Sequence, residues 1–162
     1  MVIALSRLRN LSKQGYIYAM ANEIVAIASD HAGFEMKQFV KTYLEDKGYE
    51  VMDLGPDSAN SVDYPDYGHA LGKAMDDNLA SKGVAICGSG IGISIAVNRH
   101  KGARAALCQN GLMAKLSRQH NDANVLALGA RLIGPEIALD CLDAFFETDF
   151  EGGRHERRVA KI

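Results

Sequence analysis

From Glu23 onward the sequence alternates short, continuous apolar runs with longer amphipathic stretches. The apolar runs occupy residues 24–28, 49–54, 84–87, 103–107 and 125–128. Runs of this kind are typical of strands buried on both faces, and helices between them place all the strands in parallel. With right-handed crossovers, the pattern predicts an α/β fold with a doubly wound, five-stranded parallel sheet, a Rossmann-like or flavodoxin-like three-layer sandwich.

The amphipathic stretches between these runs are predicted to be helices. Their expected bounds are 34–47, 67–79, 93–98, 112–119 and 135–146. Gly48 is placed to end the first helix and Pro135 to begin the last. Residues 55–65 are rich in turn-forming types and are expected to form a loop. The charged tail EGGRHERR at 151–158 reads as too polar to join the core.

Length and composition exclude several classes of protein. With 162 residues, 48% of them hydrophobic, the chain suits one globular domain, expected over residues 22–162. Residues 1–21 are interpreted as an extension without function. A net charge of −2 argues against nucleic-acid or membrane-surface partners, and no apolar run has the roughly 20 residues of a membrane span. Three scattered cysteines suggest neither a disulfide framework nor a zinc site, and the cytoplasm is the expected location.

Polar residues follow three of the predicted strands. Ser29-Asp30-His31 ends the first strand, Cys87-Gly88-Ser89 the third and Gly129-Ala130-Arg131 the fifth. Doubly wound sheets bind ligands beyond the carboxyl ends of their strands. We therefore expect these three clusters to meet at one edge of the sheet and to hold the chemistry.

The glycine-rich turn CGSGIGIS at 87–94 connects the third strand to a helix. Alternate glycines let the backbone approach a ligand, and the N–H groups that follow can hold a phosphate or an oxyanion. A dinucleotide fingerprint fits poorly, because that motif is GxGxxG after the first strand. For any single glycine, a turn required only for packing remains an alternative.

Cys87 is a candidate general base. A buried cysteine is by default a small apolar side chain, but a position before a helix favours the thiolate. Isomerising an aldose to a ketose requires one base and donors to the enediolate oxygens. The thiolate, the adjacent amides and the Ser89 hydroxyl supply these parts without a metal or cofactor. Cys108 and Cys141 lack such a setting and are interpreted as bystanders.

Histidines and arginines complete the candidate site. His120, in SRQHND, is interpreted as a proton shuttle for ring opening on the same edge as Cys87, the alternative being a helix-capping cation. Arginines of the tail, with His155, form a cationic patch suited to a phosphate. His69 and His100 have no comparable neighbours and are expected at the surface.

Five motifs in this chain resemble the type B ribose-5-phosphate isomerases. They are SDHAG at 29–33, DYP at 63–65, CGSGIG at 87–92, SRQHND at 117–122 and EGGRH at 151–155. That family also includes allose-6-phosphate isomerases and subunits of galactose-6-phosphate isomerase. The resemblance covers about residues 22–162, and five motifs in one order make it specific.

The resemblance implies a role for each matching residue. The catalytic residues would be Cys87 as the base, Ser89 as an enediolate donor and His120 in ring opening. The residues that would bind the substrate are Asp30, His31, Tyr64, Gly88, Gly90, Ile91, Gly92, Asn121, Arg131, Arg154 and Arg158. Arg157 falls outside the pattern. Family members are homodimers or dimers of dimers, in which residues of the His120 and Arg131 types come from the neighbouring subunit.

The expected activity is the reversible isomerisation of D-ribose 5-phosphate and D-ribulose 5-phosphate, in the non-oxidative pentose phosphate pathway. The nearest alternative is the same reaction on a six-carbon substrate, allose 6-phosphate or galactose 6-phosphate. A non-catalytic sugar-phosphate-binding module is a further alternative, and a nicotinamide oxidoreductase is a weaker one. A small sugar phosphate is the expected partner, with neither nucleic acid nor membrane.

Overall fold

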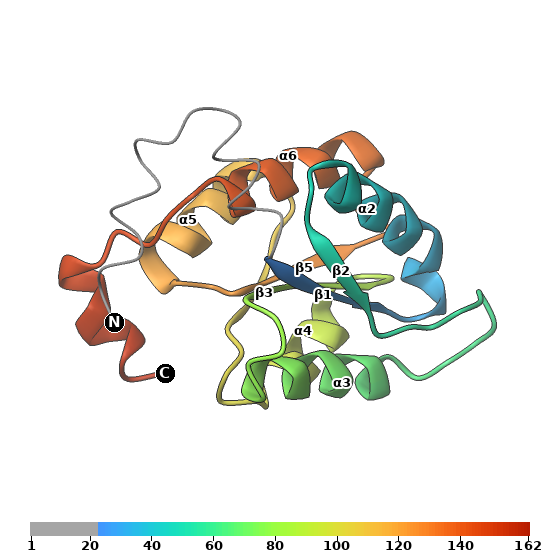
Figure 1. The fold of residues 1–162 in the computed structure, drawn as a ribbon, viewed down its shortest axis with the longest axis horizontal. Helices are drawn as coiled ribbons and strands as arrows, with labels where there is room; N and C mark the ends of the chain where they lie inside the picture. Colours follow the sequence, from blue (N-terminus) through green and yellow to red (C-terminus); the bar gives the residue numbers. More distant parts are fainter. Residues whose placement is uncertain (1–22) are drawn as a thin grey trace.

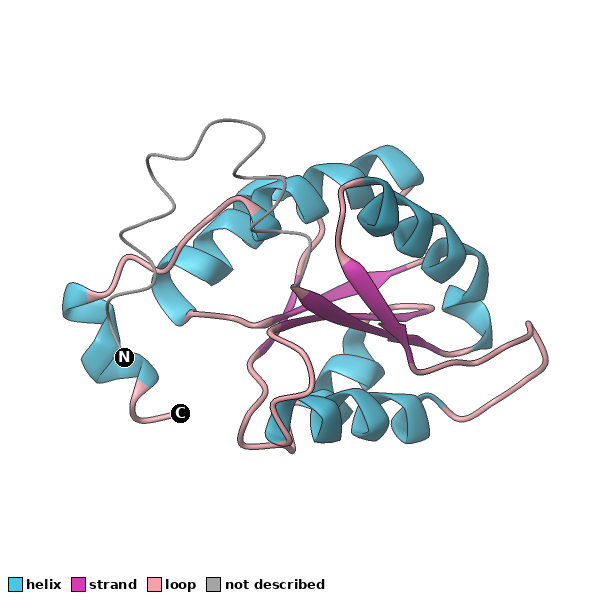
Figure 2. Ribbon diagram, viewed as in Figure 1, coloured by secondary structure: helices cyan, strands magenta, loops and turns pink. Residues whose placement is uncertain are grey.

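The computed structural model describes residues 23–162, so the interpretation of residues 1–21 lies outside the described residues. Five parallel strands form one sheet in the order β2-β1-β3-β5-β4 (Figures 1 and 2). The strands are β1 (Ile24–Ser29), β2 (Glu50–Asp53), β3 (Lys82–Cys87), β4 (Ala105–Leu107) and β5 (Val125–Gly129). The predicted fold class is confirmed.

Helices cover both faces of this sheet. The α-helices are α2 (Phe34–Asp46), α3 (Tyr64–Asp76), α4 (Ile91–Val97), α5 (Gly111–Asn121), α6 (Pro135–Phe146) and α7 (Glu156–Val159), and the short 3₁₀ helices are η2 (His31–Gly33) and η3 (Gly153–His155). Figure 1 shows α2, α5 and α6 above the sheet and α3 and α4 below it, each layer closing one apolar core. No helix within residues 23–162 has the length and apolar character of a membrane span.

Several predicted boundaries differ from the structure, those of α3 by the most. Helix α3 begins at Tyr64 rather than at residue 67, because Pro65 occupies its first turn, where a missing N–H costs nothing. It also ends at Asp76 rather than at residue 79. Strand β4 is limited to three residues, 105–107, at the edge of the sheet. The tail prediction is wrong in one respect, because η3 buries His155 to 5% exposure.

The strand order predicts a ligand crevice between β1 and β3. The chain moves from β1 outward to β2 and then returns to the other side of β1 to form β3. Doubly wound sheets open a crevice at such a reversal, beyond the carboxyl ends of the strands. The turn after β1 approaches β3 closely, because a Cβ atom on Gly33 would lie 2.8 Å from the carbonyl oxygen of Ile86. Only glycine fits this position.

A buried lysine fixes the loop that leads from β2 toward this crevice. Lys37, fully buried in α2, donates from Nζ to Oδ1 of Asp53 at 2.6 Å and to the carbonyl oxygen of Pro56 at 2.9 Å. Burial raises the pKa of Asp53, but hydrogen bonds from Lys37 and the Gly55 N–H outweigh it and hold that pKa below its usual range. The ion pair therefore anchors the start of the loop that ends at Tyr64.

Candidate active site

The sulfur of Cys87 faces the glycine-rich turn. The side chain is 4% exposed, and its Sγ accepts a hydrogen bond from the Gly90 N–H at 3.1 Å. Two residues away, the Oγ of Ser89 accepts the Ile91 N–H at 3.2 Å. We call residues 87–92 the nest. Both side chains therefore accept backbone N–H groups of the glycine-rich turn.

The nest is held against the end of β5 by contacts that require glycine. Gly90 has φ +75°, and a Cβ atom there would lie 2.4 Å from Cδ1 of Leu107 and 2.9 Å from the backbone of Leu128. On the facing strand, a Cβ atom on Gly129 would lie 2.6 Å from the carbonyl oxygen of Ser89. The packing interpretation therefore holds for Gly90, which both turns the chain and lets the nest approach β5.

Two predicted binding residues border the nest. The ring of Tyr64 lies 2.6 Å from the position that a Cβ on Gly92 would take, and this tyrosine is 42% exposed. Arg131 donates its backbone N–H to the Gly88 carbonyl at 3.0 Å, and its side chain lies against Gly88. The resemblance assigns the arginine of this type to the neighbouring subunit, whereas the structure has Arg131 beside the nest of its own chain.

Asp30 and His31 follow the carboxyl end of β1, where the Asp30 N–H donates to the Ile86 carbonyl of β3 at 3.1 Å. Asp30, 7% exposed, caps the turn through Oδ1, which accepts the Gly33 N–H at 2.9 Å. The Nδ1 of half-buried His31 hydrogen-bonds with the Val62 backbone at 3.2 Å. Nε2 is therefore the ring nitrogen of His31 that remains for an anion.

The other two cysteines are buried without a comparable neighbour. Burial raises the pKa of Cys108 to about 11 and that of Cys141 to about 12. Both side chains lie in the core on the α2, α5 and α6 face, whereas Cys87 belongs to the opposite core. They remain thiols near neutral pH, which agrees with their interpretation as bystanders.

The prediction that His120 lies on the same edge as Cys87 is wrong within one chain. Cys87 pairs with Gly129 at the carboxyl end of the sheet, whereas Gly83 pairs with Val125 at the amino end. Helix α5 returns the chain to that amino end, so His120 precedes Val125. Four strand residues of about 3.3 Å each separate the two levels by roughly 13 Å. Figure 1 shows α7 on the same side as the end of α5, away from the carboxyl ends of the strands.

The predicted residues of the tail gather around His120. Its ring stacks on that of His155, with centroids 4.5 Å apart and planes at 7°. Arg154 donates from Nε to Nε2 of His155 at 3.3 Å, and Arg154 and Arg158 are exposed, as is Asn121. His155 therefore does not belong to an exposed cationic patch, contrary to the sequence interpretation.

The sequence interpretation missed a second pair of histidines. His69 and His100 hydrogen-bond through Nδ1 and Nε2 at 3.0 Å, and Nδ1 of His100 pairs with Asp76 at 2.8 Å. These residues come from α3 and from the connection after α4, which are adjacent in space only because α3 and α4 pack together. No local sequence pattern signals such a pair.

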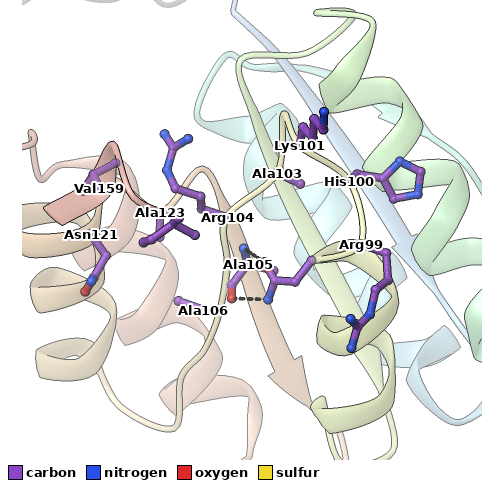
Figure 3. A pocket seen from close by; sticks show the side chains of 12 residues that line it. Arg99, His100, Lys101, Ala103, Arg104, Ala105, Ala106, Asn121, Ala123 and Val159 are labelled. Atoms are coloured by element: carbon purple, nitrogen blue, oxygen red, sulfur yellow. Dashed lines mark hydrogen bonds between the residues drawn. The ribbon is translucent and has the colours of Figure 1, made fainter. Parts of the chain in front are cut away.

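A hollow of about 540 Å³ lies at the amino end of the sheet (Figure 3). Its lining includes Asn121 and none of the nest residues. Three of its six polar side chains already have partners: Asn98 pairs with the Ala105 backbone, His100 with Asp76 and Arg104 with Asp122. The side chains of Arg99 and Lys101 point away from one another in Figure 3, so these two cations do not converge on one anion in the hollow.

Comparison with known proteins identifies the family. Residues 25–162 match the family described as Ribose/Galactose Isomerase. The chain belongs to this family. Ribose-5-phosphate isomerase B of Escherichia coli is 44% identical over 138 residues, which cover 85% of this chain and 93% of that one.

Solved structures of family members agree with the fold. A ribose 5-phosphate isomerase from Thermotoga maritima is 53% identical and matches with a TM-score of 0.84, over 86% of this chain and 96% of that chain. Ribose-5-phosphate isomerase B of Mycoplasma genitalium, solved with bound ribulose-5-phosphate, is 38% identical with a TM-score of 0.82, over 88% and 94% of the two chains. The match thus spans nearly the whole length of these two isomerases.

The packing of the nest predicts a specific sensitivity in this family member. Gly90→Ala should lower the free energy of unfolding by about 2 kcal/mol or more, because a left-handed backbone alone costs about 1–2 kcal/mol in a residue with a side chain. Gly134→Ala is the matched control, since φ is −84° there and no atom lies within 4 Å of the added methyl group. Urea unfolding measures both. Equal stability of the two variants would contradict the close packing of the nest.

Proposed function

We propose that this chain catalyses the reversible isomerisation of D-ribose 5-phosphate and D-ribulose 5-phosphate through an enediolate, within the non-oxidative pentose phosphate pathway. The observation that carries the proposal is the Sγ of Cys87 within the nest, 3.1 Å from the Gly90 nitrogen. Membership of the isomerase family supports it, as do relatives named for this activity. We assign residues 22–162 as the catalytic domain and give residues 1–21 no role.

The nest supplies both parts of the isomerisation. The Cys87 thiolate removes the proton from C2 of the open aldose, and the proton of the C2 hydroxyl passes to the oxygen on C1. The resulting thiol then returns its proton to C1, so the carbonyl group is left at C2 and the base is regenerated. Negative charge on the enediolate oxygens is stabilised by the amides of the nest and by the Ser89 hydroxyl, which can donate while its Oγ accepts the Ile91 N–H. Electrons move only between two carbons of the same sugar, so the proposed reaction needs no external redox cofactor. Because the amides of the nest carry the negative charge in this mechanism, it needs no metal either.

The remaining predicted residues bind the phosphate and the sugar. His31 and Arg131 border the crevice of one chain and supply cationic or N–H donors for the phosphate, with Asp30 and Tyr64 beside the sugar. Arg154 and Arg158 are further phosphate donors, and His120 with Asn121 assists ring opening. The last four residues lie at the opposite end of the sheet, so they reach a nest only when a second chain provides them.

We therefore propose a homodimer, alone or paired into a dimer of dimers, in which each site combines two chains. Large apolar side chains are exposed on the helices before and after the edge strand β4 and beyond the end of β5. They are Ile91, Ile95, Leu112, Met113, Leu116 and Leu132. Exposed apolar side chains concentrated in this way are typical of protein interfaces. We also keep the cytoplasm as the proposed location, since all three cysteines are free thiols.

A coupled assay tests the substrate. The purified chain, in the presence of a chelator, should convert ribose 5-phosphate with a kcat/KM about tenfold or more above that for allose 6-phosphate, because one extra carbon in a fitted pocket costs about 10- to 200-fold. The reverse ratio would favour the six-carbon alternative. Thermal stabilisation by ribose 5-phosphate without any turnover would favour a non-catalytic binding module.

The assignment of the base predicts the behaviour of Cys87→Ala. Without the sulfur, exchange of the C2 proton with solvent deuterium should fall by at least about a hundredfold, the usual contribution of a general base. Binding of inorganic phosphate should persist, since the phosphate donors remain. Cys108→Ala is the control and should retain proton exchange, measured by NMR. Normal exchange in Cys87→Ala would refute the assignment.

The shared site predicts complementation between inactive variants. Refolding Cys87→Ala together with His120→Asn should restore about a quarter of the wild-type activity, because half of the dimers are mixed and each has one intact site. The matched control mixes Cys87→Ala with Ser89→Ala. In that mixed dimer each chain has a defect in its own nest, so neither of the two sites is intact. A mixture with His120→Asn that stays as inactive as the control argues against the shared site.

A further inference from the structure

A buried imidazole connects two residues of the proposed site. The ring of His155 is stacked in parallel on His120, with centroids 4.5 Å apart, while its Nε2 accepts the Nε–H of Arg154 at 3.3 Å. His155 is 5% exposed, although its neighbours in the tail are exposed. A polar side chain buried in an exposed tail needs a reason, because burying it without partners costs free energy.

The backbone brings His155 to this position. The Glu151 N–H donates to the carbonyl oxygen of Gln119 at 3.1 Å, which fixes the tail against the end of α5. Gly152 and Gly153 then follow with φ of +66° and +56°, and they fold the chain back over His120. Only glycine readily adopts a positive φ at two consecutive positions. The tail is therefore shaped to place this ring on His120.

The same group does not suit a metal ion. Ligand atoms of His120, Glu151 and His155 lie within 4.8 Å of one another. The ring planes are nearly parallel, however, so the in-plane lone pairs of the two imidazoles cannot converge on one ion. The Nε2 of His155 is also occupied by Arg154. Stacking and hydrogen bonding, rather than metal ligation, describe the arrangement.

His155 faces charged groups from each element packed against it. Burial, then the nearby charges of His120, Arg154 and Arg158, lower the pKa of His155, and Glu151 opposes them. The uncharged ring has a lone pair on Nε2 for the Arg154 N–H. A protonated ring has N–H groups on both nitrogens and cannot accept that hydrogen bond.

We propose that His155 is a positioning residue for the isomerase site, which sets the ring plane of His120 by stacking and the direction of Arg154 by accepting its hydrogen bond. The inference rests on the proposed function, in which His120 opens the sugar ring and Arg154 binds the phosphate. Stacking acts on kcat through His120, and the hydrogen bond acts on KM through Arg154. The two contributions are therefore separable.

Two substitutions separate them. His155→Phe keeps a flat ring for stacking and removes the acceptor, so kcat should stay near the wild-type value while KM rises about tenfold, as for the loss of one hydrogen bond to a charged group. His155→Gln keeps an acceptor for Arg154 and removes the stacked ring, so KM should change little. Its kcat should fall about ten- to a hundredfold, because small misplacements of a catalytic group are costly.

The pH profile gives a readout that a merely structural role would not move. As the pH falls through the lowered pKa of His155, protonation of the ring releases Arg154, so KM of the wild type should rise steeply. The phosphate of the substrate also titrates near pH 6, but it does so alike for every variant. The extra acid-side rise in KM should therefore disappear in His155→Phe.

The other histidine pair supplies matched controls. His69→Phe and His69→Gln alter a pair whose rings are 5.3 Å apart and tilted by 60°, and which does not include His120 or His155. Both should keep wild-type kcat, KM and pH profile. The positioning role is overturned if the two His155 variants also match the wild type. It is equally overturned if both variants show the same fall in kcat and the same rise in KM, together with lower thermal stability.

Calorimetric binding of inorganic phosphate keeps this test independent of turnover. Phosphate should bind about tenfold more weakly to His155→Phe than to the wild type or to His155→Gln. If the three proteins bind phosphate in this order but the wild type does not convert ribose 5-phosphate, the proposed function is refuted and the role of His155 toward Arg154 remains. Equal phosphate binding by all three proteins would refute that role even if turnover is normal.

Discussion

The close approach of the nest to β5 is the contact on which the site depends. Gly90 and Gly129 meet where any side chain would collide with backbone or with Leu107. At this contact the turn after β3 folds back over the end of β3, and the Gly90 N–H points at the sulfur of Cys87, the last residue of that strand. The position of the sulfur at the reversal between β1 and β3 follows from strand order. A packing requirement and a chemical one are therefore met by the same residue.

A parallel sheet also limits what one chain can assemble. Every helix that follows a strand returns the chain to the amino ends of the strands. Residues at the end of a helix and residues at the end of a strand therefore lie at opposite ends of the sheet. His120 and the arginines of the tail lie at the amino end of the sheet, and Cys87 lies at the carboxyl end. A site that needs both sets must be made by two chains. This follows from topology alone and makes association a condition of activity in the proposed mechanism.

The sequence predicted the features that depend on local pattern. Continuous apolar runs located the five strands, and alternate glycines located the nest. It failed where the outcome depends on contacts between distant segments. His120 was expected beside Cys87 because sequence motifs do not state which end of the sheet a helix reaches. His155 was interpreted as a surface charge because its burial is created by two glycines with positive φ. Lys37 gave no signal, since a lysine on a helix is usually exposed.

Depth of burial does not distinguish the three thiols, since Cys87, Cys108 and Cys141 are 4%, 1% and 0% exposed. What distinguishes them is the group that the sulfur meets. Cys108 Sγ lies 3.6 Å from the Ala106 carbonyl, an acceptor that stabilises only the protonated thiol, and burial raises the pKa of Cys141 to about 12. The sulfur of Cys87 instead accepts a hydrogen bond from the backbone N–H of Gly90. The direction of one backbone amide, fixed by a glycine, therefore distinguishes the cysteine that we propose as the base from the other two.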